Sequence, residues 1–212
     1  MKILSAAAAA VLLAAAAPAA TIPTGAAGTI DAGSFYIGLG GRIDALSWKN
    51  AEDTNYPQSL MGLGLRFGYS FSPYLAVETG FSLSADDQRE MDDAQNRMYY
   101  RMTIREAQLD AYGFLPLGGS GRFRPFVTAG MAFDRGFARI RNVPLESSDK
   151  AVPPYFTERF KKNEFNWRAG GGVAVRLSDD VETRIYARYQ PFSFGALNGG
   201  TTIGFDVNVA VF

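Results

Sequence analysis

The feature that most constrains this chain is a strict alternation of residue types in segment 181–189, Val-Glu-Thr-Arg-Ile-Tyr-Ala-Arg-Tyr. Successive side chains of a β-strand point to opposite faces. One face therefore carries Glu182, Arg184, Tyr186 and Arg188, while the other is mainly aliphatic. A soluble sandwich would turn the aliphatic face toward its core, whereas a membrane-spanning barrel would turn it toward lipid and enclose the charges.

Similar alternation recurs along the chain and predicts eight strands, at residues 34–48, 60–71, 75–84, 102–117, 123–136, 164–177, 181–189 and 201–212. The connections after the odd strands are long and polar, at 49–59, 85–100, 137–163 and 191–200, whereas those after the even strands are tight turns. A barrel that crosses an outer membrane has short turns on the periplasmic side and long loops outside. A soluble Greek-key sandwich has no reason to sort its loops in this way.

Aromatic residues gather near both ends of these strands, as with Phe71 and Phe123 near the turns and Phe133, Trp167 and Tyr189 near the loops. Amphipathic rings favour the two interfaces of a bilayer, and an aliphatic band between two aromatic girdles is typical of outer-membrane strands. The pattern predicts an all-β fold: an eight-stranded antiparallel up-and-down transmembrane β-barrel of the outer-membrane type.

The N-terminus predicts export. Lys2 precedes an Ala-rich apolar run over residues 3–17, which is too short to span a bilayer comfortably, and Ala17-Pro18-Ala19 supplies small residues for cleavage. An Ala-rich helix of the folded domain is the alternative, but such a helix would normally show a polar face. We expect a signal peptide at 1–20, a flexible lead-in at 21–33 and the barrel at 34–212.

The strand number, the sorted loops, the signal peptide and the terminal Phe212 together resemble the small OmpA/OmpX-type barrels, which include the opacity-like surface proteins. The resemblance implies a location in the outer membrane of a Gram-negative bacterium. It also implies a barrel-only protein in which Phe212 serves as the signal for the barrel-insertion machinery. One departure is that Phe212 is out of phase with the apolar Val207, Val209 and Val211.

The face predicted to line the lumen collects arginines and carboxylates: Arg42, Asp44, Arg66, Glu78, Glu106, Asp110, Arg124, Arg168, Arg176, Glu182, Arg184, Arg188 and Asp206. The interior of an eight-stranded barrel is filled by side chains, and an unpaired buried charge costs several kcal/mol. We therefore expect a structural charge network, with Arg66, Arg168 or Arg188 as the partner of Glu182. A polar relay or a narrow conduction path is the functional alternative.

The sequence gives little indication of catalysis or cofactor binding. The chain has no Cys and no His, and the enzymes among the barrels it resembles use His in their active sites. We therefore expect no enzyme, cofactor or metal.

The sequence also gives little indication of calcium, nucleotide or nucleic-acid binding. The acidic segment 85–100 suggests calcium, but its spacing does not match an EF-hand, and solvated loop residues are the preferred interpretation. The glycines of 62–68 precede no helix, which excludes a nucleotide-binding loop. The zero formal charge gives no indication of nucleic-acid binding.

Two functional classes follow for such a barrel. The first is a structural or surface-interaction protein that acts in adhesion or envelope integrity through its outer loops. The second is a small pore or a transporter of small solutes or hydrophobic ligands. The basic segment 137–163 is the longest loop predicted, and its Arg159, Lys161 and Lys162 are the expected contacts with lipopolysaccharide phosphates or with an acidic host or cell surface.

Overall fold

The computed structural model describes residues 33–48, 59–84, 87–92, 96–115, 117, 121–144, 157–192 and 197–211. Nine strands lie in these ranges: β1 (Ser34–Trp48), β2 (Ser59–Ser72), β3 (Leu75–Ser84), β4 (Asp87–Asp92), β5 (Asn96–Phe114), β6 (Phe123–Pro144), β7 (Thr157–Arg176), β8 (Val181–Gln190) and β9 (Leu197–Ala210). Within the described ranges, no helix has the length and apolar character needed to cross a membrane. The predicted signal peptide 1–20, nearly all of the lead-in 21–33, and Phe212 lie outside the described residues.

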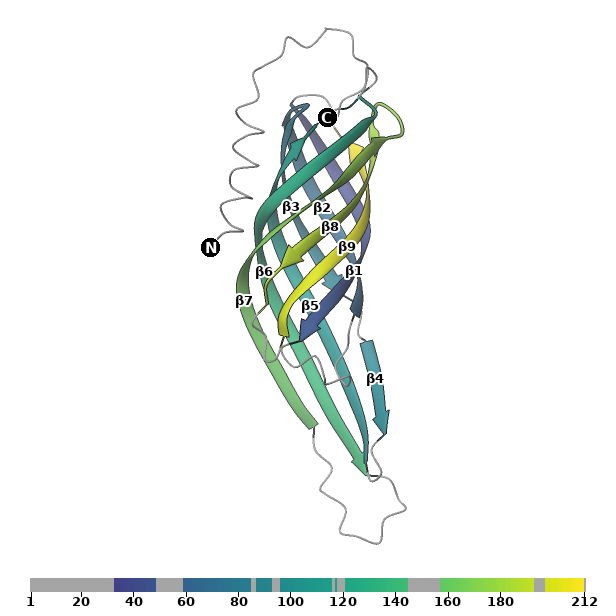
Figure 1. Cartoon of the computed structure of the whole chain (residues 1–212), viewed down its shortest axis with the longest axis vertical. Coiled ribbons are helices and arrows are strands. Elements are labelled where there is room, and N and C mark those ends of the chain that lie inside the picture. The colour runs from purple at the N-terminus through teal and green to yellow at the C-terminus, as the bar shows by residue number, and fades with distance from the viewer. Residues whose placement is uncertain are drawn as a thin grey trace.

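Eight of the strands close into an antiparallel barrel, as predicted (Figure 1). Neighbours pair in the order β3-β2-β1-β9-β8-β7-β6-β5, and pairing of β3 with β5 completes the ring. The remaining strand, β4, pairs with the distal part of β5 and lies beyond the ring. Closure leaves no free sheet edge within the membrane, where an unpaired backbone group would cost several kcal/mol.

The short turns lie together at one end of the barrel. There the amide of Ala210 donates to the carbonyl of Asp180 in the β7–β8 turn, and Gly33 donates to Ser70 near the β2–β3 turn. The opposite ends of the strands, together with β4 and the outer parts of β5 and β6, lie at the lower end in Figure 1. Because outer-membrane barrels keep short turns in the periplasm, we assign the lower end to the extracellular side.

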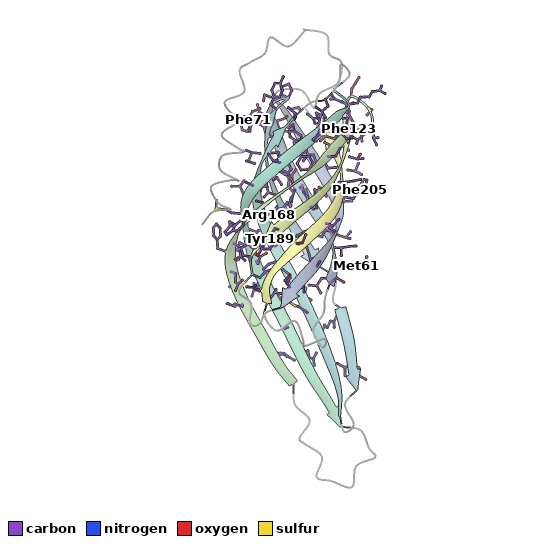
Figure 2. The ribbon with its side chains drawn as sticks, viewed as in Figure 1. Met61, Phe71, Phe123, Arg168, Tyr189 and Phe205 are labelled. Atoms are coloured by element: carbon purple, nitrogen blue, oxygen red, sulfur yellow. The ribbon has the colours of Figure 1, made fainter. Side chains whose placement is uncertain are left out.

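The outer face is apolar and the inner face is polar, which agrees with the predicted alternation. Ile185 is 61% exposed, whereas its neighbours Arg184 and Tyr186 are buried. Figure 2 shows Phe71 and Phe123 near the turn end and Met61 toward the other end, and all three are exposed. An aliphatic surface of this kind is stable in lipid and excludes the soluble sandwich.

The predicted loops were wrong in three places. Segment 85–100 contains β4 and the start of β5, segment 137–163 contains the end of β6 and the start of β7, and β9 already begins at Leu197 within 191–200. The fourth strand also ends at Phe114, before the predicted residue 117. The cause is that β5, β6 and β7 continue past the lipid, where neither face must be apolar and the alternation that marks a membrane strand disappears.

Candidate functional site

Among the described side chains, the lumen buries equal numbers of opposite charges. Seven arginines are buried: Arg42, Arg66, Arg124, Arg168, Arg176, Arg184 and Arg188. Seven carboxylates are buried with them: Asp44, Glu78, Glu106, Asp110, Asp134, Glu182 and Asp206. All residues proposed for the interior network are therefore buried, and Asp134 is an acid that the sequence interpretation left out.

Glu78 is the centre of the periplasmic half. Its carboxylate accepts hydrogen bonds from Arg184 Nη1 at 2.8 Å, Arg66 Nη1 at 3.2 Å and the hydroxyl groups of Tyr112 at 2.9 Å and Tyr36 at 3.2 Å. Glu78 is fully buried. Four donors on one carboxylate satisfy most of its lone pairs, which is the condition under which a buried charge is stable.

Tyrosine rings hold the guanidinium groups in place. The Arg184 guanidinium lies 4.9 Å from the ring centroids of both Tyr36 and Tyr112, and that of Arg188 lies 4.2 Å from Tyr186. Each distance is within the range of a cation–π interaction. A Cβ at Gly68 would overlap the Tyr36 ring, and a Cβ at Gly204 would overlap Tyr186, so glycine at these two positions makes room for the rings.

Glu182 binds partners other than those expected. Its carboxylate accepts from Arg184 Nε at 2.8 Å and from Arg124, whereas Arg66, Arg168 and Arg188 bind elsewhere in the lumen. The prediction failed because strand tilt and register decide which side chains meet inside a barrel.

Glu106 and Asp110 form the centre of the extracellular half. Glu106 bridges Arg42 at 2.7 Å and Arg168 at 2.8 Å, while Asp110 accepts from Arg168 Nε at 2.7 Å and lies 3.4 Å from Arg188. Figure 2 places Arg168 within the barrel outline. Because Arg168 contacts both acids, these residues form one continuous cluster across the lumen.

The remaining predicted charges lie around these centres. Asp44 binds Arg42 at 2.9 Å, Asp206 binds Arg66 at 2.8 Å, and Arg176 donates at 3.0 Å to the carbonyl groups of the β7–β8 turn. The sequence interpretation missed the neutral members of the network, which include Tyr36, Ser82, Gln108, Tyr112, Asn166, Tyr186, Gln190 and Thr202. Their position on the polar face of each strand was the available signal.

Two apolar clusters lie in the lumen with the charges. Toward the extracellular end, side chains from several strands form a buried cluster: Leu46, Leu60, Met102, Ile104, Ala138, Phe192 and Leu197. Toward the periplasm, a second cluster is built mainly from aromatic rings: Tyr36, Ala76, Tyr112, Phe114, Phe126, Ala174 and Tyr186. Its rings alternate with charges, since the guanidinium group of Arg124 lies 4.6 Å from the Phe114 ring centroid. Among the described residues, charges, rings and aliphatic side chains are therefore packed together in the lumen.

The three basic residues proposed for outside contact do not share one face. Arg159 and Lys161 occupy outward positions on β7 and are exposed, whereas Lys162 occupies the opposite face and binds Glu164 at 2.7 Å. The acidic side chains of segment 85–100, on which the calcium alternative depended, lie outside the described side chains. Among described residues, no group of three His, Cys, Asp or Glu side chains could hold a metal.

Residues 5–211 match the model of the outer membrane protein beta-barrel domain. The chain belongs to this family. Curated protein sequences provide no match. Among solved structures, this outer-membrane barrel is similar to Neisserial surface protein A, with a TM-score of 0.56, 10% identity, and coverage of 84% of this chain and 97% of that one.

It is also similar to the outer membrane protein OprG of Pseudomonas aeruginosa, with a TM-score of 0.50, 13% identity, and coverage of 85% of this chain and 98% of that one. At these identities the likeness concerns the fold. The family and the fold agree with the resemblance to small OmpA/OmpX-type barrels, and they identify this chain as an outer-membrane barrel.

Proposed function

We propose that this barrel is a closed, surface-exposed scaffold with a structural or interaction role, in adhesion or envelope integrity, rather than a pore. The observation that carries the proposal is the lumen packed with side chains, in which buried ion pairs alternate with aromatic rings and an apolar cluster lies beyond them toward the extracellular end. Opening a path for solute would require breaking buried ion pairs such as Arg168–Asp110 and Arg184–Glu78. Leaving either partner unpaired costs about 3–5 kcal/mol.

The extracellular extension of β5, β6 and β7 supports the interaction role. These strands have 19, 22 and 20 residues, whereas a tilted strand needs only about 9–11 to cross a bilayer. Roughly half of each strand therefore continues beyond the hydrocarbon core as a stiff sheet (Figure 1). Recognition on a rigid scaffold usually resides in such exposed elements.

Conductance across a planar bilayer tests the proposal. The refolded protein should give no steady channels, and neither should a variant in which residues 136–162 are replaced by an Asn-Gly turn. That turn suits the register because Arg135 and Asn163 lie opposite each other. Steady conductance by the unaltered protein would favour the second class, a pore or transporter, over the scaffold.

A further inference from the structure

The outer wall of the extension changes abruptly from apolar to cationic. Reading outward across β5, β6 and β7, the opposed residues are Ala107–Phe133–Phe165, then Arg105–Arg135–Asn163, then Thr103–Phe137–Lys161, then Arg101–Arg139–Arg159. We call each such set of opposed residues a rung, and we call the six cations of the last three rungs the basic wall. None of the nine outward positions in these described rungs holds Asp or Glu.

This arrangement is unfavourable without a ligand. Arg139 of β6 and Arg159 of β7 lie directly opposite each other, and like charges in that relation destabilise a sheet. Arg139 and Arg159 are exposed and make no ion pair with any described carboxylate. A bound anion would remove the repulsion, so the rung is better suited to a complex than to a bare surface.

The rung nearest the membrane adds a second observation. The guanidinium groups of Arg105 and Arg135 lie 5.4 Å and 5.2 Å from the ring centroid of Phe137, within cation–π range. Arg135 Nε is buried and has no hydrogen-bond partner. Two guanidinium groups held against one ring, with a donor still unused, form a fixed site for an oxyanion such as phosphate.

The position of the wall identifies the class of ligand. Each rung lies two residues beyond the last, which is roughly 5 Å along the axis of a tilted barrel. The cations therefore begin roughly 5 Å above the Phe133–Phe165 rung and continue to roughly 15 Å. A polar headgroup layer is only about 5–8 Å thick, so the upper rung extends above an ordinary phospholipid headgroup.

Below the basic wall lies a place for the acyl chains. A hollow of about 540 Å³ on the lipid-facing wall is lined mainly by apolar side chains, including Leu65, Phe81 and Phe133, and Arg105 and Arg135 also line it. An acyl chain in this hollow would place its own headgroup beside these two arginines. The hollow and the cations thus suit two parts of one molecule.

We propose that the basic wall binds a phosphorylated, multiply acylated glycolipid of the lipopolysaccharide class. Arg105 and Arg135 hold a phosphate at the membrane surface, while Lys161, Arg139 and Arg159 hold anionic groups of the saccharide above it. This inference rests on the proposed surface role and names its partner. It also distinguishes Lys161 and Arg159 from Lys162, which faces the other way and is bound to Glu164.

Titration of the refolded full-length protein in neutral detergent tests the proposal. The probes are purified lipopolysaccharide, the same lipopolysaccharide after phosphatase treatment, and phosphatidylglycerol. Replacing Arg139, Arg159 and Lys161 with Gln should weaken the apparent Kd for lipopolysaccharide by about 100-fold at low salt, and by less at high salt. Phosphatase-treated lipopolysaccharide and phosphatidylglycerol should both bind the unaltered protein weakly.

Adjacent lysines provide the matched control. Lys161→Gln should weaken binding, whereas Lys162→Gln and Arg122→Gln, in the periplasmic turn, should leave it unchanged. Equal losses at positions 161 and 162, equal affinity for phosphatidylglycerol, or undiminished binding after phosphatase treatment would each overturn the proposal. Conductance is independent of these titrations, so a conducting barrel would refute the closed scaffold without affecting the outcome for the lipid site.

Discussion

Arginine occurs in two contrasting regions of this molecule. In the lumen, Arg168 and Arg184 are buried, each binds two carboxylates, and aromatic rings surround Arg184. On the outer wall, Arg139 and Arg159 are exposed and face each other. The same side chain thus stabilises the closed barrel in one place and remains available to a ligand in the other.

This difference between buried and exposed arginines indicates where function can change without loss of the fold. A buried ion pair whose one partner is removed leaves an uncompensated charge, so the lumen tolerates little substitution. An exposed cation without a partner contributes little to stability. The extension can therefore vary its contacts while the lumen keeps the barrel closed.

The largest expected effect is at the centre of the lumen. Glu78→Gln leaves Arg66 and Arg184 without the carboxylate they share, and we expect it to lower the free energy of unfolding by about 3–5 kcal/mol. Urea titration of the refolded protein in lipid vesicles measures this. Asp179→Asn, at an exposed turn position, is the control and should change stability by less than about 0.5 kcal/mol. Equal effects of the two variants would mean that the lumen is solvated.

The next effect concerns the outer face of the barrel. Ile185→Arg places a charge on a side chain that is 61% exposed and that we assign to lipid. It should cost about 2–4 kcal/mol if the position lies near mid-bilayer, while Ile185→Leu should be nearly neutral. The same vesicle unfolding experiment compares them, and a well-tolerated arginine would contradict the orientation of the two faces.

A double-mutant cycle sharpens the account of the lumen. Glu182→Gln alone leaves Arg124 buried and unpaired, whereas Glu182→Gln combined with Arg124→Met removes both members of that pair. We expect the double variant to be more stable than the single one, with a coupling energy of about 1–3 kcal/mol. Strictly additive losses would show that water already screens the pair.

The smallest effect is expected on the basic wall. Arg139→Gln removes a repulsion between opposed arginines, so the free energy of unfolding in lipid vesicles that lack lipopolysaccharide should change by less than about 0.5 kcal/mol, or rise slightly. The change in unfolding free energy of Arg139→Gln, set against that of Glu78→Gln under the same conditions, compares the two regions directly. A loss of several kcal/mol at Arg139 would mean that this arginine has a structural role, as the luminal arginines have.

The barrel was predictable from sequence because lipid imposes alternation on each strand. Ile185 and Arg184 could be assigned to opposite faces for that reason. Beyond the lipid this constraint ends, and the outer parts of β5, β6 and β7 resembled loops. The basic wall could not be found at that stage, because it depends on the register that places Arg101, Arg139 and Arg159 in one rung.

The ion-pair partners in the lumen could not be predicted from sequence either, for a different reason. Strand parity identified which charges face inward, but it gives no information on the tilt and stagger that bring strands together across the lumen. Arg184 and Glu78 are 106 residues apart in the chain and pair from β8 to β3. Tyr112 lies on the same polar face and donates to Glu78, yet charge alone gave no reason to include it.

Labelling of single cysteines tests the central claim most directly, because the chain contains no native Cys. Ala132→Cys introduces a thiol at a buried luminal position, and Arg159→Cys introduces one on the exposed outer wall. With a membrane-impermeant maleimide added to intact cells, we predict complete labelling of the Arg159→Cys variant and none of the Ala132→Cys variant over the same period. Equal labelling of both would contradict a closed lumen, and protection of the Arg159→Cys variant would contradict the extracellular position of the extension.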